Sequence, residues 1–184
     1  SASLAVNIPL HPGIVERGVL IVDDSRLQRK SAEQCLIAFG VDRIYEAANG
    51  EEALAMLRSA RIPPAVMILD LEMPLLDGIE VLQHLASDDY KPAIILVSSS
   101  EEVLISAVAA MAEALHIPLL GAFRKPVYPA ILASALAAFD QVVKVDASSS
   151  TVTANICVER LTSAITNNRI VPFYQPKIEL QSPK

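Results

Sequence analysis

The chain alternates between short apolar segments and longer segments with helical spacing, and this alternation constrains its fold most strongly. Five of the short segments are predicted as strands, at residues 18–24, 43–47, 65–71, 92–99 and 118–123. Most of them are apolar throughout, which is typical of parallel strands covered by helices on both faces of a sheet. Because crossovers between parallel strands are right-handed, the pattern predicts a doubly wound α/β sandwich.

The segments between the predicted strands carry helix signals at their ends. Ser25 and Asn49 are expected to be N-caps, and Gly40 is expected to end the first of these helices. The last helix of the sandwich is predicted as one continuous stretch, with inward apolar residues from 132 to 143. The chain therefore contains five β–α units.

Composition limits the classes of protein to which the chain can belong. Hydrophobic residues make up 52% of its 184 residues and charged residues 20%, which excludes intrinsic disorder and supplies a core. The net charge of −6 argues against a nucleic-acid partner, because no basic surplus is available to neutralise phosphates. Cys35 and Cys157 lie far apart without a histidine cluster, so neither a disulfide framework nor a zinc site is expected. No signal peptide or membrane span is predicted, and a cytoplasmic location is expected.

Polar side chains that suit phosphoryl chemistry stand at the ends of four predicted strands: Asp23, Asp24, Asp70, Ser98 and Lys125. In an open α/β sheet the carboxyl ends of the strands form the functional crevice, so these side chains are expected to converge. Three carboxylates repel one another unless a cation lies among them, and oxygen ligands of this kind suit Mg²⁺. A carboxylate beside a metal ion and a lysine can act as a nucleophile towards a phosphoryl group.

In these residues the chain resembles the receiver domains of two-component response regulators, the CheY-like domains. The resemblance covers about residues 16–144 and rests on Asp23-Asp24, the segment DLEMPLLDG that begins at Asp70, Ser98, and Lys125-Pro126. It implies a flavodoxin-like (βα)5 fold with strand order 2-1-3-4-5. It also implies a sensor histidine kinase or a phosphotransfer protein as the partner.

The same resemblance implies a role for each site residue. Asp70 is expected to be the phosphoacceptor, and the Mg²⁺ ligands are expected to be Asp23, Asp24, Asp70 and the backbone carbonyl of Glu72. Ser98 and Lys125 are expected to contact the phosphoryl oxygens. The Lys125–Pro126 peptide bond is expected to be cis.

The sequence departs from the family pattern at one switch position. Many receivers carry Tyr or Phe three residues before the lysine, and that ring reports phosphorylation by turning inward. Here the position holds Ala122, and Phe123 is expected on the opposite face of the strand. An unphosphorylated receiver that acts only as an interaction or dimerisation domain, forming a homodimer, is therefore an alternative.

A second alternative is a Mg²⁺-dependent phosphohydrolase that works through an aspartyl phosphate. Such an enzyme needs a second Asp two residues after the nucleophile as its general acid, and Glu72 stands there instead. This chain is therefore expected to be a signalling module and not an enzyme.

The C-terminal segment resembles the start of another domain. Residues 160–180 are similar to the opening helix and first strand of EAL-type cyclic-di-GMP phosphodiesterase domains, including the recurring element YQP. Phosphorylation at Asp70 is then expected to control a phosphodiesterase output domain, although self-association through an amphipathic C-terminal helix is an alternative. The expected organisation is a leader at 1–16, a receiver domain at 17–145, a linker at 146–153, and a helix-strand extension that begins the EAL-like domain at 154–184.

Overall fold

The computed structural model describes residues 8–148, in which five parallel strands form one sheet. The strands are β1 (Val19–Val22), β2 (Ile44–Ala47), β3 (Val66–Asp70), β4 (Ala93–Ser98) and β5 (Leu119–Arg124). Their order is β2-β1-β3-β4-β5, and all neighbouring pairs are parallel. The predicted doubly wound fold with order 2-1-3-4-5 is confirmed, and the predicted helix-strand extension lies outside the described residues.

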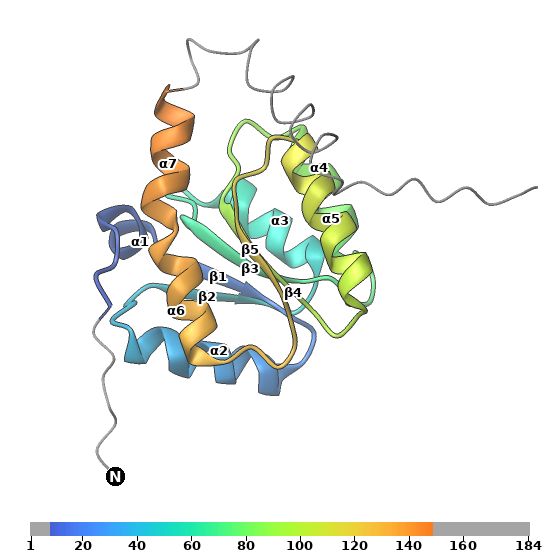
Figure 1. Cartoon of the computed structure of the whole chain (residues 1–184), viewed down its shortest axis with the longest axis horizontal. Helices are drawn as coiled ribbons and strands as arrows, with labels where there is room; N and C mark the ends of the chain where they lie inside the picture. The colour runs from blue at the N-terminus through green and yellow to red at the C-terminus, as the bar shows by residue number, and fades with distance from the viewer. Residues whose placement is uncertain (1–7, 149–184) are drawn as a thin grey trace, which may run out of the picture. The chain divides into compact units, whose positions relative to one another are not determined.

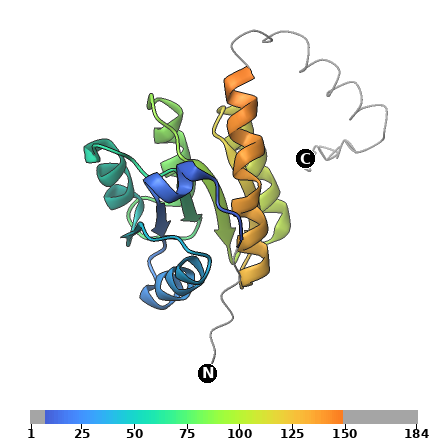
Figure 2. The same ribbon diagram turned by 90° about the vertical axis from the view of Figure 1, so that its left-hand side faces the viewer.

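Helices cover both faces of the sheet (Figures 1 and 2). One face carries α3 (Gly50–Ser59), α4 (Gly78–Ala86) and α5 (Glu102–Ala114). The other face carries α2 (Arg26–Ala38) and α6 (Pro129–Ala137). Because β1, β3 and β4 are buried on both faces, each of their residues is apolar until the strand reaches its carboxyl end.

The expected helix signals lie at the expected places. The side chain of Ser25 accepts a hydrogen bond from the backbone N–H of Gln28, and Asn49 caps α3 in the same way. Gly40, with a φ of +88°, follows the end of α2 in the left-handed conformation that favours glycine.

The structure contains one helix that the sequence pattern does not predict. Helix α1 (Pro12–Arg17) lies in the segment expected to be a leader, and its Ile14 side chain is fully buried in the core beneath α2 and α6. The side chain of His11 caps this helix by accepting a hydrogen bond from the backbone N–H of Gly13. A six-residue helix with a single buried residue carries too short a periodic signal to be recognised.

The predicted final helix is divided at a single residue, Ala138, which keeps right-handed helical dihedral angles. Helix α6 ends at Ala137, and α7 (Phe139–Ser148) begins after Ala138. No Pro or Gly marks this break in the sequence. Phe139 is buried beside the ring of His11, with the ring centroids 5.1 Å apart. The start of α7 thus contacts the N-cap residue of α1, a long-range contact that periodicity could not reveal.

The start of α4 lies directly against the end of β3. A Cβ atom at Gly78 would lie 2.4 Å from the carbonyl oxygen of Asp70 and 2.8 Å from the Cα atom of Leu71. These are backbone atoms that cannot move aside cheaply, so glycine is required here. The chain can thus turn sharply behind the Asp70 side chain.

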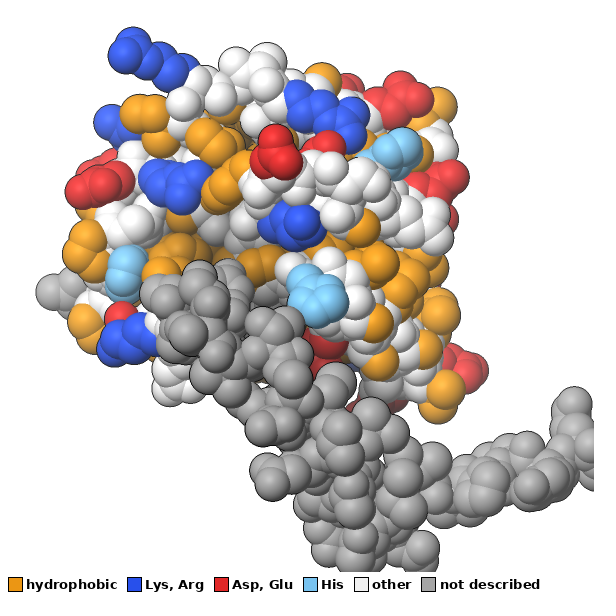
Figure 3. Space-filling view, turned by 90° about the horizontal axis from the view of Figure 1, so that it is seen from above, with side chains coloured by type: hydrophobic (Ala, Val, Ile, Leu, Met, Phe, Trp, Pro, Cys, Tyr) orange, Lys and Arg blue, Asp and Glu red, His pale blue; other side chains and the backbone are white. Residues whose placement is uncertain are grey.

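All five strands belong to one compact unit, Ser1–Lys144. Within residues 8–148, no helix combines the length and the apolar character needed to cross a membrane. On the face shown in Figure 3, the described basic side chains lie among acidic and apolar ones instead of forming one basic patch.

Candidate functional site

Three aspartates meet at the carboxyl ends of β1 and β3, which are neighbours in the sheet. Asp70 is the last residue of β3, and Asp23 and Asp24 directly follow β1. Each offers one carboxylate oxygen, and these three oxygens lie within 4.8 Å of one another. Asp23 and Asp70 are buried, whereas Asp24 is exposed. The strand order brings together this acidic cluster (Asp23, Asp24 and Asp70) from distant parts of the sequence.

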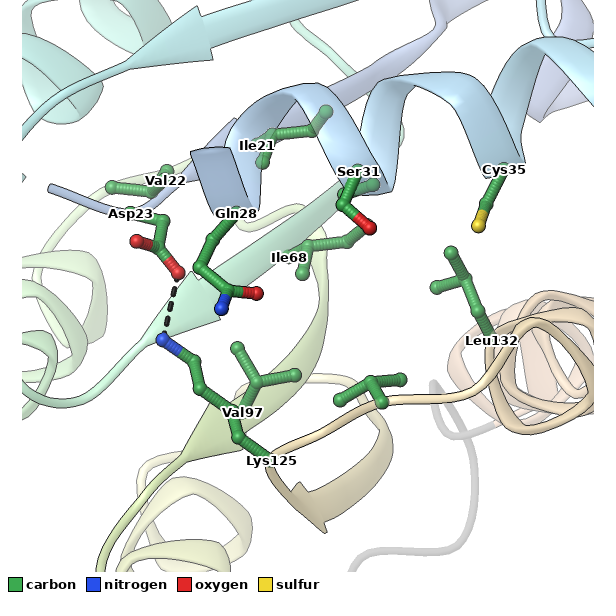
Figure 4. Close-up of a pocket in the computed structure, with 12 residues that line it drawn as sticks. Ile21, Val22, Asp23, Gln28, Ser31, Cys35, Ile68, Val97, Lys125 and Leu132 are labelled. Atoms are coloured by element: carbon green, nitrogen blue, oxygen red, sulfur yellow. Dashed lines mark hydrogen bonds and ion pairs between the residues drawn. The ribbon is translucent and has the colours of Figure 1, made fainter. Parts of the chain in front are cut away.

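Lys125 neutralises part of the negative charge of the acidic cluster. It follows β5, and its backbone N–H donates to the carbonyl oxygen of Ser98 at 2.8 Å. Its Nζ atom donates to Oδ2 of Asp23 and to Oδ2 of Asp70, each at 2.8 Å; Figure 4 shows the bond to Asp23. The Lys125–Pro126 peptide bond is cis. One ammonium group therefore bridges two buried carboxylates from different strands.

Burial perturbs both partners of this bridge. Burial raises the pKa of Asp70, and the hydrogen bonds from Lys125 and from the backbone N–H of Glu72 oppose that rise without cancelling it. Burial lowers the pKa of Lys125, but its hydrogen bonds to Asp23 and Asp70 outweigh this effect, so the pKa is raised. The site therefore holds a carboxyl group whose charged form is disfavoured by burial, beside an ammonium group whose charged form is favoured by two carboxylates.

Glu72 connects the loop after β3 to the serines at the end of β4. Its carboxylate accepts hydrogen bonds from the backbone N–H of Ser99, at 3.2 Å, and from the hydroxyl of Ser100. The Ser98 hydroxyl is fully buried and accepts a hydrogen bond from the backbone N–H of Ser100 at 3.0 Å. Sequence reasoning assigned only the backbone carbonyl of Glu72 to the site, because a side-chain contact across 28 residues leaves no local pattern.

Arg29 is a further site residue that sequence reasoning missed. Its Nη1 atom donates to the carbonyl oxygens of Asp23, at 2.8 Å, and Asp24, at 3.3 Å. Its Nε atom donates to Oε2 of Glu46 on β2 at 2.9 Å. A basic residue shortly after two aspartates was the available signal, but spacing alone does not separate it from the adjacent Lys30.

A cavity of about 60 Å³ opens beside Lys125, between α2 and the segment that follows β5 (Figure 4). Asp23, Gln28 and Ser31 contribute polar groups to its wall. The rest of the lining is mainly apolar and includes Ile68, Val97, Val127 and Leu132. Cys35 also lines the cavity, and burial raises the pKa of its thiol, which disfavours the reactive thiolate.

The donor set of the acidic cluster fits Mg²⁺. Each of its three members offers a carboxylate oxygen, and hard divalent cations prefer oxygen ligands. Mg²⁺ usually keeps several of its waters, and the exposure of Asp24 leaves room for them on that side. The side chains present therefore match the cation that the sequence predicts.

Comparisons with known proteins extend these observations. The family model of the response regulator receiver domain matches residues 19–137. The positive alginate biosynthesis regulatory protein of Pseudomonas aeruginosa is 35% identical over 120 residues, which are 64% of this chain and 45% of that protein. A protein-glutamate methylesterase/protein-glutamine glutaminase of Myxococcus xanthus is 44% identical over 94 residues, which are 50% of this chain and 26% of that protein. The chain thus spans less than half the length of these two relatives.

Solved receiver structures share the fold. A response regulator receiver domain protein from Clostridium thermocellum has a TM-score of 0.58 at 24% identity, covering 69% of this chain and 96% of that one. The chemotaxis protein CheY4 of Vibrio cholerae has a TM-score of 0.53 at 28% identity, covering 67% of this chain and 96% of that one. The segment matched by the family model contains all three aspartates and Lys125. The chain belongs to the family of response regulator receiver domains.

Proposed function

We propose that the chain is a phosphoacceptor receiver module and that Asp70 accepts the phosphoryl group. The observation that carries the proposal is the Lys125 ammonium, which lies 2.8 Å from a carboxylate oxygen of Asp70 and 2.8 Å from one of Asp23. This arrangement keeps a carboxylate oxygen beside a fixed positive charge, as phosphoryl transfer to a carboxylate requires. A receiver of this kind is a signalling module and not a catalyst.

The proposed chemistry is a single displacement at phosphorus. An oxygen of the ionised Asp70 carboxylate forms the new P–O bond, while the bond between phosphorus and the donor's nitrogen or oxygen breaks and its electron pair leaves with the donor. Lys125 stabilises the charge on the transferred oxygens, and the hydroxyl of Ser98, at the end of the neighbouring strand β4, is proposed to contact one of them. Mg²⁺, when held by Asp23, Asp24, Asp70 and the backbone carbonyl of Glu72, would neutralise further negative charge.

Phosphorylation by a small donor tests this assignment. The chain is incubated with acetyl phosphate and Mg²⁺, and the intact mass is measured for the wild type and for Asp70→Asn. We expect the mass of one phosphoryl group on the wild type only. Asp42→Asn is a suitable control, because Asp42 is exposed and does not belong to the acidic cluster. Phosphoryl addition to Asp70→Asn at the wild-type level would contradict the assignment.

Glu72 provides an observation against the phosphohydrolase alternative. A general acid needs a raised pKa to hold its proton at neutral pH. The hydrogen bond from the Ser100 hydroxyl instead lowers the pKa of Glu72. The hydrogen bonds from Ser99 and Ser100 direct its carboxylate towards the segment that follows β4.

Ala122 favours a second candidate function, that of an interaction domain. Ala122 packs in the core beneath α5, whereas Phe123 packs on the other face of the sheet, so the aromatic readout has no ring at its usual position. A groove of about 380 Å³ borders Ala122 between α5 and β5. If the wild type takes up no phosphoryl group from acetyl phosphate while it binds a partner or a second copy, this candidate replaces the first.

We further propose that the physiological donor is a cytoplasmic sensor histidine kinase or phosphotransfer protein, and that the output is a cyclic-di-GMP phosphodiesterase. The similarity of residues 160–180 to the start of EAL-type domains supports the output. The corresponding proposed boundaries are 17–145 for the receiver, 146–153 for the linker and 154–184 for the EAL-like segment. Phosphorylation of a chain that carries a complete output domain should then change its rate of cyclic-di-GMP cleavage, and an unchanged rate would contradict the coupling.

A further inference from the structure

Arg29 makes three hydrogen bonds that join the acidic loop (residues 23–25) to the edge of the sheet. Nη1 donates to the carbonyl oxygens of the two consecutive residues Asp23 and Asp24, and Nε donates to the carboxylate of Glu46. Glu46 lies on β2, directly opposite Ile21 of β1. The planar guanidinium therefore spans from β2 to the two peptide groups that lead into α2.

The surroundings of Arg29 make this a fixed arrangement. Its side chain is only 14% exposed, and Glu46 also accepts a hydrogen bond from Lys30 at 2.9 Å. The hydrogen bonds from Lys30 and Arg29 lower the pKa of Glu46, so its carboxylate stays ionised at neutral pH. Lys30 also donates to Glu46, but within the described residues it makes no hydrogen bond to the acidic loop.

The two aspartates of the loop depend on Arg29 to different degrees. The Asp23 carboxylate accepts hydrogen bonds from Lys125 and from the backbone N–H of Ser25, so its orientation is fixed independently. Asp24 is exposed, and its backbone carbonyl accepts a hydrogen bond from Arg29 at 3.3 Å. Arg29 therefore holds the backbone from which the Asp24 side chain projects.

We infer that Arg29 is a positioning residue for the binding of Mg²⁺. It orients the ligand Asp24 by holding the Asp24 backbone, and it does not contact the cation. This inference rests on the proposed function. The loss of Arg29 would have two opposite effects on the affinity for Mg²⁺. Removing a cation near three carboxylates would tighten Mg²⁺ binding by Coulomb's law, whereas releasing the peptide planes would weaken it.

The test is a calorimetric titration of the full chain with MgCl₂, for the wild type, Arg29→Met, Arg29→Lys and Lys30→Met. We expect Arg29→Met to weaken Mg²⁺ binding by about tenfold, as is usual when a residue that orients a metal ligand is lost. Arg29→Lys should remain several-fold weaker than the wild type, because one ammonium cannot bind both carbonyl oxygens and Glu46 together. Lys30→Met also removes one positive charge that contacts Glu46, and this variant should bind Mg²⁺ as the wild type does.

The outcomes separate the inference from the proposed function. Wild-type chain that neither binds Mg²⁺ nor takes up a phosphoryl group refutes the proposed function. Wild-type binding together with equal affinities for Arg29→Met and Lys30→Met refutes only the inference, as does tighter binding by Arg29→Met. Melting curves and amide NMR spectra in EDTA identify any variant that fails to fold, and Arg29→Lys then decides the question: wild-type affinity in that variant overturns the inference.

Discussion

At the scale of single residues, the site is governed by the balance between burial and charge. Asp70 is 2% exposed and Asp23 is 4% exposed, so neither carboxylate can rely on water to stabilise its charge. Lys125 supplies the compensating charge, since it donates to both at 2.8 Å. Removing one partner of such a buried group leaves the others uncompensated.

The balance between burial and charge at Asp70 can be tested through the pKa of its carboxyl group. In metal-free protein we expect the pKa of Asp70 to lie above its ordinary value of 3.8, because burial disfavours the charged form. Lys125→Met should raise this pKa further, because the hydrogen bond from the lysine favours the ionised carboxylate. Carboxyl ¹³C NMR between pH 3 and pH 8 follows the transition, and the signal that disappears in Asp70→Asn identifies it. A midpoint that Lys125→Met lowers would contradict this account.

The raised pKa of Asp70 makes the free energy of unfolding depend on pH. The folded carboxyl of Asp70 holds its proton more tightly than the carboxyl of the unfolded chain does. Its contribution to the free energy of unfolding is therefore fully present below the ordinary Asp pKa and is lost as the pH rises through the folded pKa. Asp70→Asn removes this group, so its stability relative to the wild type should increase as the pH rises through that range.

Asp24 is the exposed member of the acidic cluster, and its removal separates metal binding from folding. We expect Asp24→Ala to weaken Mg²⁺ binding by more than about tenfold, since an oxygen ligand is lost. Without metal, its free energy of unfolding should stay within about 0.5 kcal/mol of the wild type or rise, because a charge that repels Asp23 and Asp70 is removed. Calorimetric titration and urea denaturation in EDTA measure the two quantities. Unchanged Mg²⁺ affinity would refute the role of Asp24.

At the scale of elements, the ends of the helices determine where the site loops lie. The loop from Leu71 to Asp77 leads from β3 into α4, and both sides of a capping box close it. The Asp77 carboxylate accepts a hydrogen bond from the backbone N–H of Glu80 at 2.9 Å, and the Glu80 carboxylate accepts one from the backbone N–H of Asp77 at 3.1 Å. The cap and the close approach of Gly78 to Asp70 together fix the start of α4.

The cap can be tested with two substitutions at one position. Asp77→Ala removes the acceptor for the backbone N–H of Glu80 and should lower the free energy of unfolding by about 1 kcal/mol. Asp77→Asn keeps a carbonyl oxygen in that place and should cost much less, because Asn is as good an N-cap as Asp. Urea denaturation monitored by circular dichroism measures both. Equal losses in the two variants would show that charge, and not capping, is responsible.

At the scale of the whole molecule, the folded unit extends further towards the N-terminus than the sequence pattern suggests. Helix α1 contributes the fully buried Ile14 to the core between α2 and α6. Arg17 at its end donates to the carbonyl oxygen of Pro63 at 3.0 Å and lies over the ring of Tyr90. His11 contacts Phe139 at the start of α7. A segment outside the matched residues 19–137 is thus part of the packed domain.

Neighbouring residues of α1 offer a matched test of this packing. Ile14→Ala should lower the free energy of unfolding by about 2–5 kcal/mol, because it removes buried atoms from a filled core. Val15→Ala changes the adjacent residue, which is 42% exposed, and should have an effect within about 0.5 kcal/mol. Thermal and urea denaturation of the full chain distinguish the two. Similar small losses for both variants would mean that α1 does not pack as described.

The sequence by itself determined the features that depend on local patterns. Continuous apolar runs predicted the buried parallel strands, and polar residues at the ends of those runs marked Asp23, Asp70 and Ser98. The N-caps Ser25 and Asn49 were also predictable, because a cap acts within one helical turn of its own position. Such signals repeat or end over a few residues, so they survive without knowledge of the rest of the molecule.

The tertiary structure alone decided the contacts between distant elements. The docking of α1 has no periodic signal, since it depends on the core surface that distant elements provide. Arg29 is distinguished from Lys30 only by the direction in which α2 presents it to the acidic loop. The physical reason is the same in each case: burial, charge compensation and hydrogen-bond geometry arise from neighbours in space, which are fixed only when the sheet and its helices have packed.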